Sequence, residues 1–221
     1  MKDGKNKVDQ FENIHQPEIN TNDFGTLAID LGSSTTVVVF QKENGQTPEL
    51  LDLPPISRAP GEIPSLICKS SGKEEFYIIG QEIIDLNLIN QNDNNLSQDF
   101  KRWIGSTEIE PIYDSTISPE KAGEILIHKI WEKVTAKVNI KRLVLTAPVD
   151  TYREYRHWLV NVCNSLDVKE IALVDEPTAA AMGAGLEPGS TLLVLDFGGS
   201  TIDMSIVALE GGEGQASPIA Q

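Results

Sequence analysis

Two short segments of this chain combine acidic, hydroxyl and glycine residues in the same order. Each begins with an aspartate at the end of an apolar run, Asp30 in the first segment and Asp196 in the second. A glycine-containing tip with hydroxyl side chains comes next, and a second apolar run follows it. The tips consist of Gly32, Ser33, Ser34 and Thr35, and of Gly198, Gly199, Ser200 and Thr201. Both segments therefore have the pattern of a hairpin with a small, polar tip.

The chemistry that these residue types favour is the binding of phosphate and a metal ion. Glycine lets the backbone approach an anion closely, and turn N–H groups and hydroxyls donate hydrogen bonds to phosphate oxygens. An aspartate beside such a loop repels bare phosphate, but it can hold Mg²⁺ through the ion's water shell. One loop is weak evidence, because hairpin tips commonly use Asp, Gly and Ser for turn geometry alone. Two loops in one chain predict a nucleotide held between two hairpins.

Charged residues between the two loops are candidates for the reaction itself. Lys101 lies beside Arg102 in a chain with few cations, and a lysine there could act as a point charge on a phosphoryl group. The alternative is an ordinary solvated pair of cations. Asp175 and Glu176 end an apolar run just before a helix start, where a carboxylate could order water or could simply cap the helix. Both alternatives stay open for each pair.

Other reactive residues do not form a recognisable constellation. The histidines His15, His128 and His157 are scattered and lack metal-ligand spacing, and the chain has no nucleophile elbow or P-loop signature. Cys68 and Cys163 lie far apart in apolar runs, which is typical of buried thiols. We therefore expect neither a disulfide nor a histidine metal site. The cysteine usage favours a reducing compartment.

The composition is that of an acidic globular protein. Among 221 residues, 18 are Lys or Arg and 33 are Asp or Glu, so the formal net charge is −15. This charge repels nucleic-acid backbones and anionic lipid. No apolar run approaches the roughly 20 residues that a bilayer span needs. We expect a cytoplasmic protein that binds neither nucleic acid nor membrane.

The elements that must position these residues alternate between strands and helices. Ser118 and Pro119 predict a helix start, because serine caps the first turn and proline is favoured at its first position. Apolar residues at four-residue spacing continue this helix to about Val138. Further strands or helices are expected at residues 142–147, 151–166, 170–174, 191–196 and 201–209. This alternation predicts an α/β fold.

The order of these motifs resembles the nucleotide-binding domain of DnaK-type heat-shock chaperones, the seventy-kilodalton class, within the actin and sugar-kinase superfamily of ATPases. The resemblance covers about Leu27 to Leu209, and residues 173–181 are especially close to the chaperone branch. It implies an actin-like ATPase fold, which is ribonuclease H-like. It further implies binding of ATP or ADP with Mg²⁺, and ATP hydrolysis coupled to protein folding in the stress response.

The resemblance also implies roles for individual residues. Lys101 matches a lysine that reaches the γ-phosphate and the attacking water. Glu176 matches a glutamate that orders this water or the metal shell, and Asp196 an aspartate that helps to position the nucleophile. Asp30, and Asp196 through water, would hold Mg²⁺. The two glycine-containing tips would then be the two phosphate loops.

Several positions depart from the family pattern. Pro148 and Arg156 resemble a proline and an arginine that relay the nucleotide state, but residues 149–151 differ from the Ala, Tyr and Phe usual after that proline. This puts interdomain signalling in doubt. Residues 33–34 are serines where threonines are usual, which keeps the hydroxyls. Ser200 replaces a glycine and could crowd the phosphate.

The extent of the resemblance predicts the domain organisation. We expect a flexible polar leader at 1–24, an essentially complete first lobe at 25–190, only the opening hairpin of the second lobe at 191–209, and a flexible tail at 210–221. The adenosine-binding part would be missing, so the expected partners are co-chaperones or a protein that completes the second lobe. The alternatives are a catalytically inactive interaction module and, third, a small-molecule kinase relative.

Overall fold

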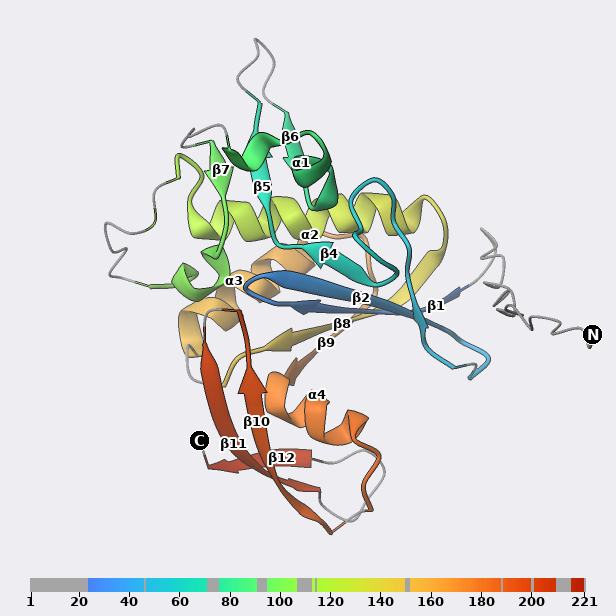
Figure 1. Cartoon of the computed structure of the whole chain (residues 1–221). Helices are drawn as coiled ribbons and strands as arrows, with labels where there is room; N and C mark the ends of the chain where they lie inside the picture. Colours follow the sequence, from blue (N-terminus) through green and yellow to red (C-terminus); the bar gives the residue numbers. More distant parts are fainter. Residues whose placement is uncertain are drawn as a thin grey trace, which may run out of the picture.

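The computed structural model shows a mixed α/β protein with three sheets (Figure 1). The residues that the structure describes are 24–45, 47–70, 76–90, 95–106, 113, 115–149, 152–187, 189–199, 201–209 and 216–220. All but the last residue of the predicted leader, and also Ser200, lie outside this described part. The expected α/β fold of the actin-like ATPase type is confirmed.

The first sheet has the strand order β3-β2-β1-β8-β9, with β4 paired to β2. Its strands are β1 (Phe24–Leu31), β2 (Thr35–Lys42), β3 (Glu49–Leu50), β4 (Glu62–Pro64), β8 (Asn139–Ala147) and β9 (Glu170–Asp175). The β1–β2 pair is an antiparallel hairpin, while β8 and β9 run parallel to β1. Alternate residues of β1 and β2 are buried, because one face of these strands packs on the main core.

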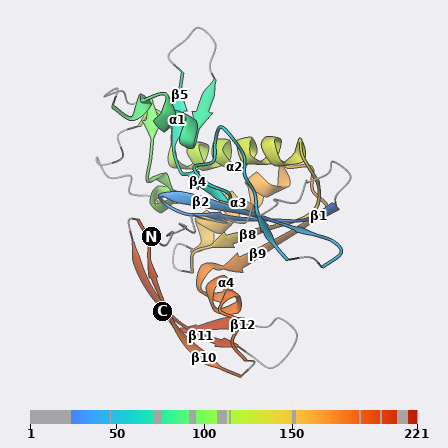
Figure 2. The ribbon, with the colours of Figure 1, turned by 45° about the vertical axis from the view of Figure 1, so that its right-hand side comes forward.

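Two helices lie on the same side of this sheet, α2 (Pro119–Thr135) and α3 (Tyr152–Asn164) (Figures 1 and 2). As predicted, α2 begins after Ser118, whose hydroxyl accepts a hydrogen bond from the backbone N–H of Lys121 at 3.2 Å. The helix ends at Thr135, three residues before the expected Val138, which is nevertheless buried. The apolar face of α2 supplies a large share of the main core.

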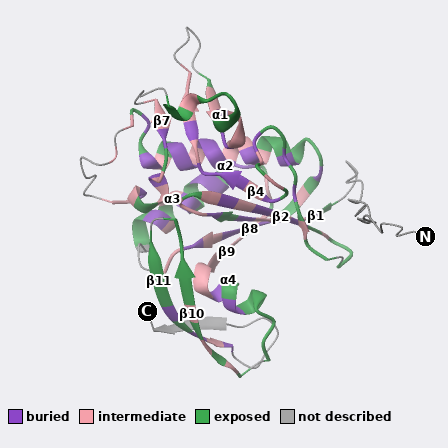
Figure 3. Ribbon diagram, in the orientation of Figure 1, coloured by how far each residue is buried: buried purple, intermediate pink, exposed green. Residues whose placement is uncertain are grey.

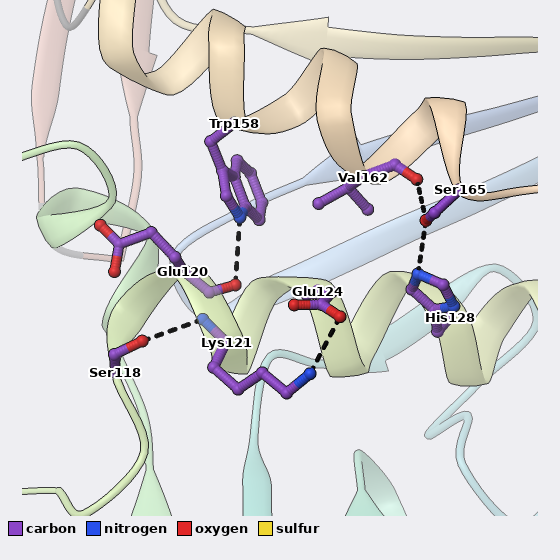
Figure 4. Close-up of polar contacts among 8 residues, drawn as sticks. All are labelled: Ser118, Glu120, Lys121, Glu124, His128, Trp158, Val162 and Ser165. Carbon is purple, nitrogen blue, oxygen red and sulfur yellow. Dashed lines mark hydrogen bonds and ion pairs between the residues drawn. The ribbon is translucent and has the colours of Figure 1, made fainter.

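Polar contacts tie α2 to α3 along the seam between them (Figure 4). The indole N–H of Trp158 donates to the backbone carbonyl of Glu120 at 3.1 Å, near the start of α2. Two turns further along, the His128 ring and the Ser165 hydroxyl are hydrogen-bonded at 2.9 Å. This histidine therefore has a structural contact with α3's end.

A smaller unit is inserted between β4 and α2. It contains a sheet of order β6-β5-β7 and short helical turns. Its elements are β5 (Ile67–Lys69), β6 (Tyr77–Ile79), α1 (Gln81–Asp85), η1 (Leu88–Asn90), β7 (Leu96–Ser97) and η2 (Phe100–Trp103). The last of these, η2, carries Lys101. The preceding residue of the same turn, Phe100, is buried in the main core and anchors η2 there.

The second sheet has the order β10-β11-β12 and holds the second predicted hairpin. Its strands are β10 (Thr191–Phe197), β11 (Ile202–Leu209) and β12 (Ala216–Ala220). The structure differs here from the expected flexible tail, because residues 216–220 pair with β11. The sequence did not predict this strand because Pro218 interrupts its β-pattern. A proline is tolerated here because β12 is an edge strand.

Helix α4 (Glu176–Gly183) lies between the two sheets (Figures 1 and 2). Its Ala181 packs with Val207 and Leu209 in a small second core. The boundary expected at residue 190 therefore separates α4 from the sheet on which it packs. Within the described residues, no helix is long and apolar enough to cross a membrane. Cys163 is buried, as predicted, whereas Cys68 is only partly buried.

Candidate functional site

The carboxyl ends of the parallel strands of the first sheet bring several polar residues together. In register, Ile29 of β1 pairs with Leu145 of β8, and Ala147 pairs with Asp175 at the end of β9. Asp30 and Thr146 are therefore adjacent, and the Thr146 hydroxyl donates a hydrogen bond to the Asp30 carboxylate. This bond fixes the orientation of a carboxylate that is otherwise exposed.

The first predicted phosphate loop joins β1 to β2, and hydrogen bonds from Ser65 to its backbone hold it in place. The backbone N–H of Ser65 donates to the carbonyl of Ser34 at 2.9 Å, and its hydroxyl donates to the carbonyl of Gly32 at 2.7 Å. The same hydroxyl lies 2.9 Å from the Thr36 hydroxyl, and both side chains are fully buried. Gly32 is required here, because a Cβ would lie 2.3 Å from the carbonyl oxygen of Thr35. The sequence reasoning missed Ser65, since nothing in a Pro-rich segment signals contact with a distant loop.

The second predicted phosphate loop joins β10 to β11 and meets the first loop directly. Asp196 pairs in register with Asp203 just below the tip, and the N–H of Gly198 donates to the carbonyl of Thr201 at 2.9 Å. A Cβ on Gly199 would lie only 1.8 Å from the hydroxyl oxygen of Ser34. The backbone of one loop therefore approaches the side chain of the other as closely as only glycine permits.

The two loops border a cavity of about 520 Å³ between the sheets. An adjoining cavity of about 480 Å³ shares part of its lining and extends along Pro148 and Val194. Nearly all of the predicted site residues line the first cavity: Asp30, Gly32, Ser33, Ser34, Thr35, Lys101, Glu176, Asp196, Gly198, Gly199 and Thr201. Thr146, Ala179, Ala180 and Asp203 also line it. Residues from distant parts of the sequence thus converge on one volume.

Lys101 and Glu176 form an ion pair that faces this cavity. The Lys101 ammonium donates to the Glu176 carboxylate at 2.7 Å, and their side chains are only 13% and 21% exposed. Burial raises the pKa of the Glu176 carboxyl above its ordinary value, while the Lys101 charge and hydrogen bond oppose this rise. Lys101 is therefore not part of a solvated surface pair, although its neighbour Arg102 is exposed.

Asp175 has a partner other than the helix that it precedes. It occupies the N-cap position of α4, but its side chain makes no capping hydrogen bond. Instead its carboxylate accepts a hydrogen bond from the Arg156 guanidinium of α3. Glu176 pairs with Lys101, so neither carboxylate acts as the cap that was the alternative interpretation.

Tyr155 was not singled out from the sequence, where it is one apolar position in the stripe of α3. Its ring is buried against Trp158, with ring centroids 5.3 Å apart, and its hydroxyl has no hydrogen-bond partner in the described part of the chain. Burial raises the pKa of Tyr155 well above its ordinary value, and the charges of Glu176 and Asp30 add to the rise. A neutral phenol therefore lies close to the carboxylates of the site.

The donor set fits a Mg²⁺ ion that is held through phosphate and water. Mg²⁺ prefers oxygen ligands, keeps several waters, and is usually bound by one or two carboxylates together with substrate phosphates. Asp30 and Asp196 line one cavity from opposite sheets. Among the residues that the structure describes, no three His, Cys, Asp or Glu side chains gather closely enough to hold a metal by themselves. Asp30 and Asp196 thus offer the carboxylate oxygens that a hydrated Mg²⁺ ion prefers.

Comparison with known proteins decides the family. A family model described as MreB/Mbl protein matches residues 63–216, which is more than half of the chain. The chain belongs to the MreB/Mbl family. The match includes η2, α4 and the second hairpin, so the cavity of this MreB/Mbl member is built largely from matched residues.

This MreB/Mbl chain is also similar to heat-shock chaperones, which confirms the resemblance seen in the sequence. It is 27% identical over 191 residues to the chaperone protein DnaK of Mycoplasma mobile, covering 84% of this chain and 30% of that protein. It is 27% identical over 217 residues to the human heat shock 70 kDa protein 13, covering 84% of this chain and 44% of that protein. The chain spans about a third to under half of the length of these relatives.

Proposed function

We propose that this MreB/Mbl member binds ATP or ADP with Mg²⁺ in the cavity between its two hairpin loops. The observation that carries the proposal is the contact between the two loops. Gly199 of the second loop lies against Ser34 of the first, and both residues line the same cavity. Backbone N–H groups and hydroxyls of both loops would bind the phosphates. Asp30, oriented by Thr146, and Asp196 would face the hydrated metal ion. When bound, this ion would neutralise part of the negative charge of the phosphates.

Hydrolysis of the bound ATP is the second part of the proposal. Lys101 would place its ammonium on the transferring phosphoryl group, where charge develops, and Glu176 would orient the attacking water. The ion pair between them supports this division, because it holds both groups at the cavity wall. The raised pKa of Glu176 brings this carboxyl nearer to the neutral range in which a general base is effective.

A direct test is calorimetric titration of the chain with ATP in the presence of Mg²⁺, alongside thermal unfolding. A ligand at a hundred times its Kd stabilises by about 2.7 kcal/mol, so the Tm should rise by roughly 5–10 °C. Asp30→Asn should abolish the Mg²⁺-dependent part of this rise. Asp167→Asn is the matched control, since it removes an exposed carboxylate that lines neither cavity. A folded chain whose Tm does not respond to millimolar MgATP contradicts the proposal.

Phosphate release separates an ATPase from an inactive domain. If the chain hydrolyses ATP, Glu176→Gln should lower kcat while nucleotide affinity is retained. If wild type binds ATP but releases phosphate no faster than Glu176→Gln, the chain is the catalytically inactive module. Faster ATP consumption on adding a small hydroxyl-bearing acceptor would identify the kinase alternative.

The wider setting that we propose is a cytoplasmic, DnaK-like one in the stress response. There the nucleotide state would be coupled to protein folding through co-chaperones or a second polypeptide that completes the second lobe. The similarity to DnaK and to heat shock 70 kDa protein 13 supports this setting. The test is whether a J-domain protein or a nucleotide-exchange factor changes the ATP hydrolysis rate of the chain. No change with either factor argues for an independent nucleotide-binding role.

A further inference from the structure

The hydroxyl of Tyr155 is a buried polar group without a hydrogen-bond partner in the described part of the chain. The residue is 1% exposed, and its ring packs against Trp158. Figure 3 shows that buried residues concentrate on the side of the first sheet where α2 and α3 lie, whereas β10 and β11 are largely exposed. Because nearly all buried polar groups in folded proteins are paired, this unpaired hydroxyl requires an explanation.

Helix α3 brings Tyr155 next to η2 and to the start of α4. A Cβ on Gly105, just after η2, would lie 3.0 Å from the backbone nitrogen of Tyr155, so the two backbones are packed closely. The next residue of α3, Arg156, donates a hydrogen bond to the carboxylate of Asp175, which directly precedes Glu176. These contacts hold Tyr155 beside both segments that supply the buried ion pair of the site.

Two carboxylates of the site act electrostatically on the Tyr155 hydroxyl. Burial raises the pKa of Tyr155, and the charges of Glu176 and Asp30 raise it further, so the phenol keeps its proton and can donate it in a hydrogen bond. The Asp30 carboxylate already accepts a hydrogen bond from Thr146. The Glu176 carboxylate accepts one from Lys101, whose proposed role lies on the nucleotide. Glu176 is therefore the carboxylate whose partner would change.

Bound ATP would compete with Glu176 for the ammonium of Lys101. The phosphates would attract this single positive charge, and a largely buried carboxylate that loses its partner is strongly disfavoured. We propose that, as Lys101 turns to the phosphate, the Tyr155 hydroxyl donates a hydrogen bond to the Glu176 carboxylate and keeps it oriented towards the attacking water. Tyr155 is thus a positioning residue that acts through Glu176, and this inference rests on the proposed function.

A stability cycle tests the exchange of partners without any nucleotide. In wild type the Tyr155 hydroxyl is unpaired, so Tyr155→Phe should keep or raise the Tm. In Lys101→Ala the hydroxyl would take over as a donor to Glu176, so adding Tyr155→Phe should lower the Tm by about 3–6 °C. Differential scanning calorimetry of the four proteins at pH 8, which favours the ionised carboxyl, measures both steps.

Two controls identify the acceptor and the hydroxyl. Asp30→Asn removes the charge of the other carboxylate, and the Tm loss in the Lys101→Ala background should persist when it is added. Tyr113→Phe is the matched control, because the Tyr113 hydroxyl is hydrogen-bonded to the Ser97 hydroxyl and to the carbonyl of Ile117. Tyr113 lines neither cavity, so this variant should lower the Tm equally in the wild-type and Lys101→Ala backgrounds.

Turnover supplies the readout that a purely structural hydroxyl would not change. Tyr155→Phe should lower the kcat of ATP hydrolysis about tenfold and leave the Kd for MgATP unchanged, because the hydroxyl acts only after the nucleotide has bound. Tyr113→Phe should change neither quantity at a temperature where it is folded. The measurements are phosphate release under saturating MgATP and calorimetric titration.

Three results would overturn the proposal. Equal Tm effects of Tyr155→Phe in both backgrounds would show that the hydroxyl does not exchange partners. Loss of the effect on adding Asp30→Asn would make Asp30 the acceptor. An unchanged kcat in Tyr155→Phe, while wild type hydrolyses ATP, would show that the hydroxyl does not position Glu176. A chain that does not hydrolyse ATP contradicts the proposed function instead, and the stability cycle still decides whether Tyr155 and Glu176 pair.

Discussion

At the scale of single residues, the site depends on contacts between groups that are far apart in the chain. Gly199 and Ser34 come from hairpins in different sheets, and their contact sets how closely the two loops approach. Lys101 and Glu176 come from a 3₁₀ turn and a helix start, and each limits the position of the other. Small changes at these residues should therefore alter function more than stability.

Gly199→Ala is expected to weaken nucleotide binding while the fold is kept. The added Cβ would lie 1.8 Å from the Ser34 hydroxyl and 2.9 Å from its Cβ, so the loops must move apart. Both residues are exposed, so the cost in unfolding free energy should be small. Gly183→Ala is the control, since its Cβ meets nothing within 4 Å and alanine favours the helix by about 0.5–1 kcal/mol. Unchanged MgATP affinity in Gly199→Ala, measured by calorimetry, would argue against contact between the loops.

Lys101→Ala is expected to make stability depend more steeply on pH. Without the lysine, the pKa of the buried Glu176 carboxyl rises further, because burial is no longer opposed. A raised carboxyl pKa contributes stability below the unfolded-state pKa of about 4.3, and this contribution is lost as pH rises through the folded-state value. The variant should therefore approach wild type near pH 4 and fall increasingly below it towards pH 7, as measured by urea unfolding.

The control for this titration is the same substitution in a Glu176→Gln background. A glutamine does not ionise, so the stability gap caused by Lys101→Ala should then be the same at all pH values tested. A gap that keeps its pH dependence without Glu176 would assign the effect to another carboxyl.

At the scale of elements, supports outside the loops decide whether the site is ordered. The turn after β4 supplies Ser65, which holds the first loop through Gly32, Ser34 and Thr36. The start of α2 is supported by Ser118, which caps the helix (Figure 4) and lines neither cavity. We therefore expect substitutions of these two serines to differ in their effect on binding.

Ser65→Ala and Ser118→Ala should both destabilise the protein, but only the first should impair binding. Ser65→Ala leaves the fully buried Thr36 hydroxyl without its partner and should cost about 1–3 kcal/mol of unfolding free energy. Ser118→Ala loses an N-cap and should cost about 1 kcal/mol. MgATP affinity at a temperature where both variants are folded should fall for Ser65→Ala alone. Equal affinities would mean that the first loop keeps its shape without Ser65.

At the scale of the whole molecule, the two sheets differ greatly in the size of their cores. The first sheet packs on a large core that includes α2, α3 and the small inserted unit. Among the residues that the structure describes, the buried core beneath the second sheet consists of Ala181, Val207 and Leu209. Regions with few buried apolar contacts open at lower free energy than the rest of a protein.

Hydrogen exchange should therefore be faster in β10 and β11 than in β1 and β8. Bound nucleotide contacts loops of both sheets in our proposal, so MgADP should slow exchange in β10 and β11 most. The measurement is amide exchange followed by mass spectrometry, with and without MgADP. Slowing confined to the first sheet would show that the second loop does not contribute to binding.

The sequence by itself determined the main elements and named most of the residues that line the cavity of the candidate site. The cap and the four-residue spacing gave the start and face of α2, because these depend on local backbone and side-chain geometry. The paired loops were singled out because one pattern of aspartate, glycine and hydroxyl residues occurs twice, whereas the roles expected of Lys101 and Glu176 came from the resemblance to the chaperone family. The predicted Asp30 and Asp196 line one cavity, as a nucleotide site between two hairpins requires.

Only the tertiary structure decided which distant groups meet. Ser65 and Tyr155 carried no sequence signal, since a serine after prolines and a tyrosine in a helical stripe have many uses. The pairing of Asp175 with Arg156 rather than with the helix end, and the pairing of β12 with β11, depend on long-range packing. The exposed apolar face of the β10–β11 hairpin likewise became visible only when the register placed apolar side chains of both strands opposite one another. Local patterns fix elements, but the free energy of contacts between elements selects the partners of each side chain.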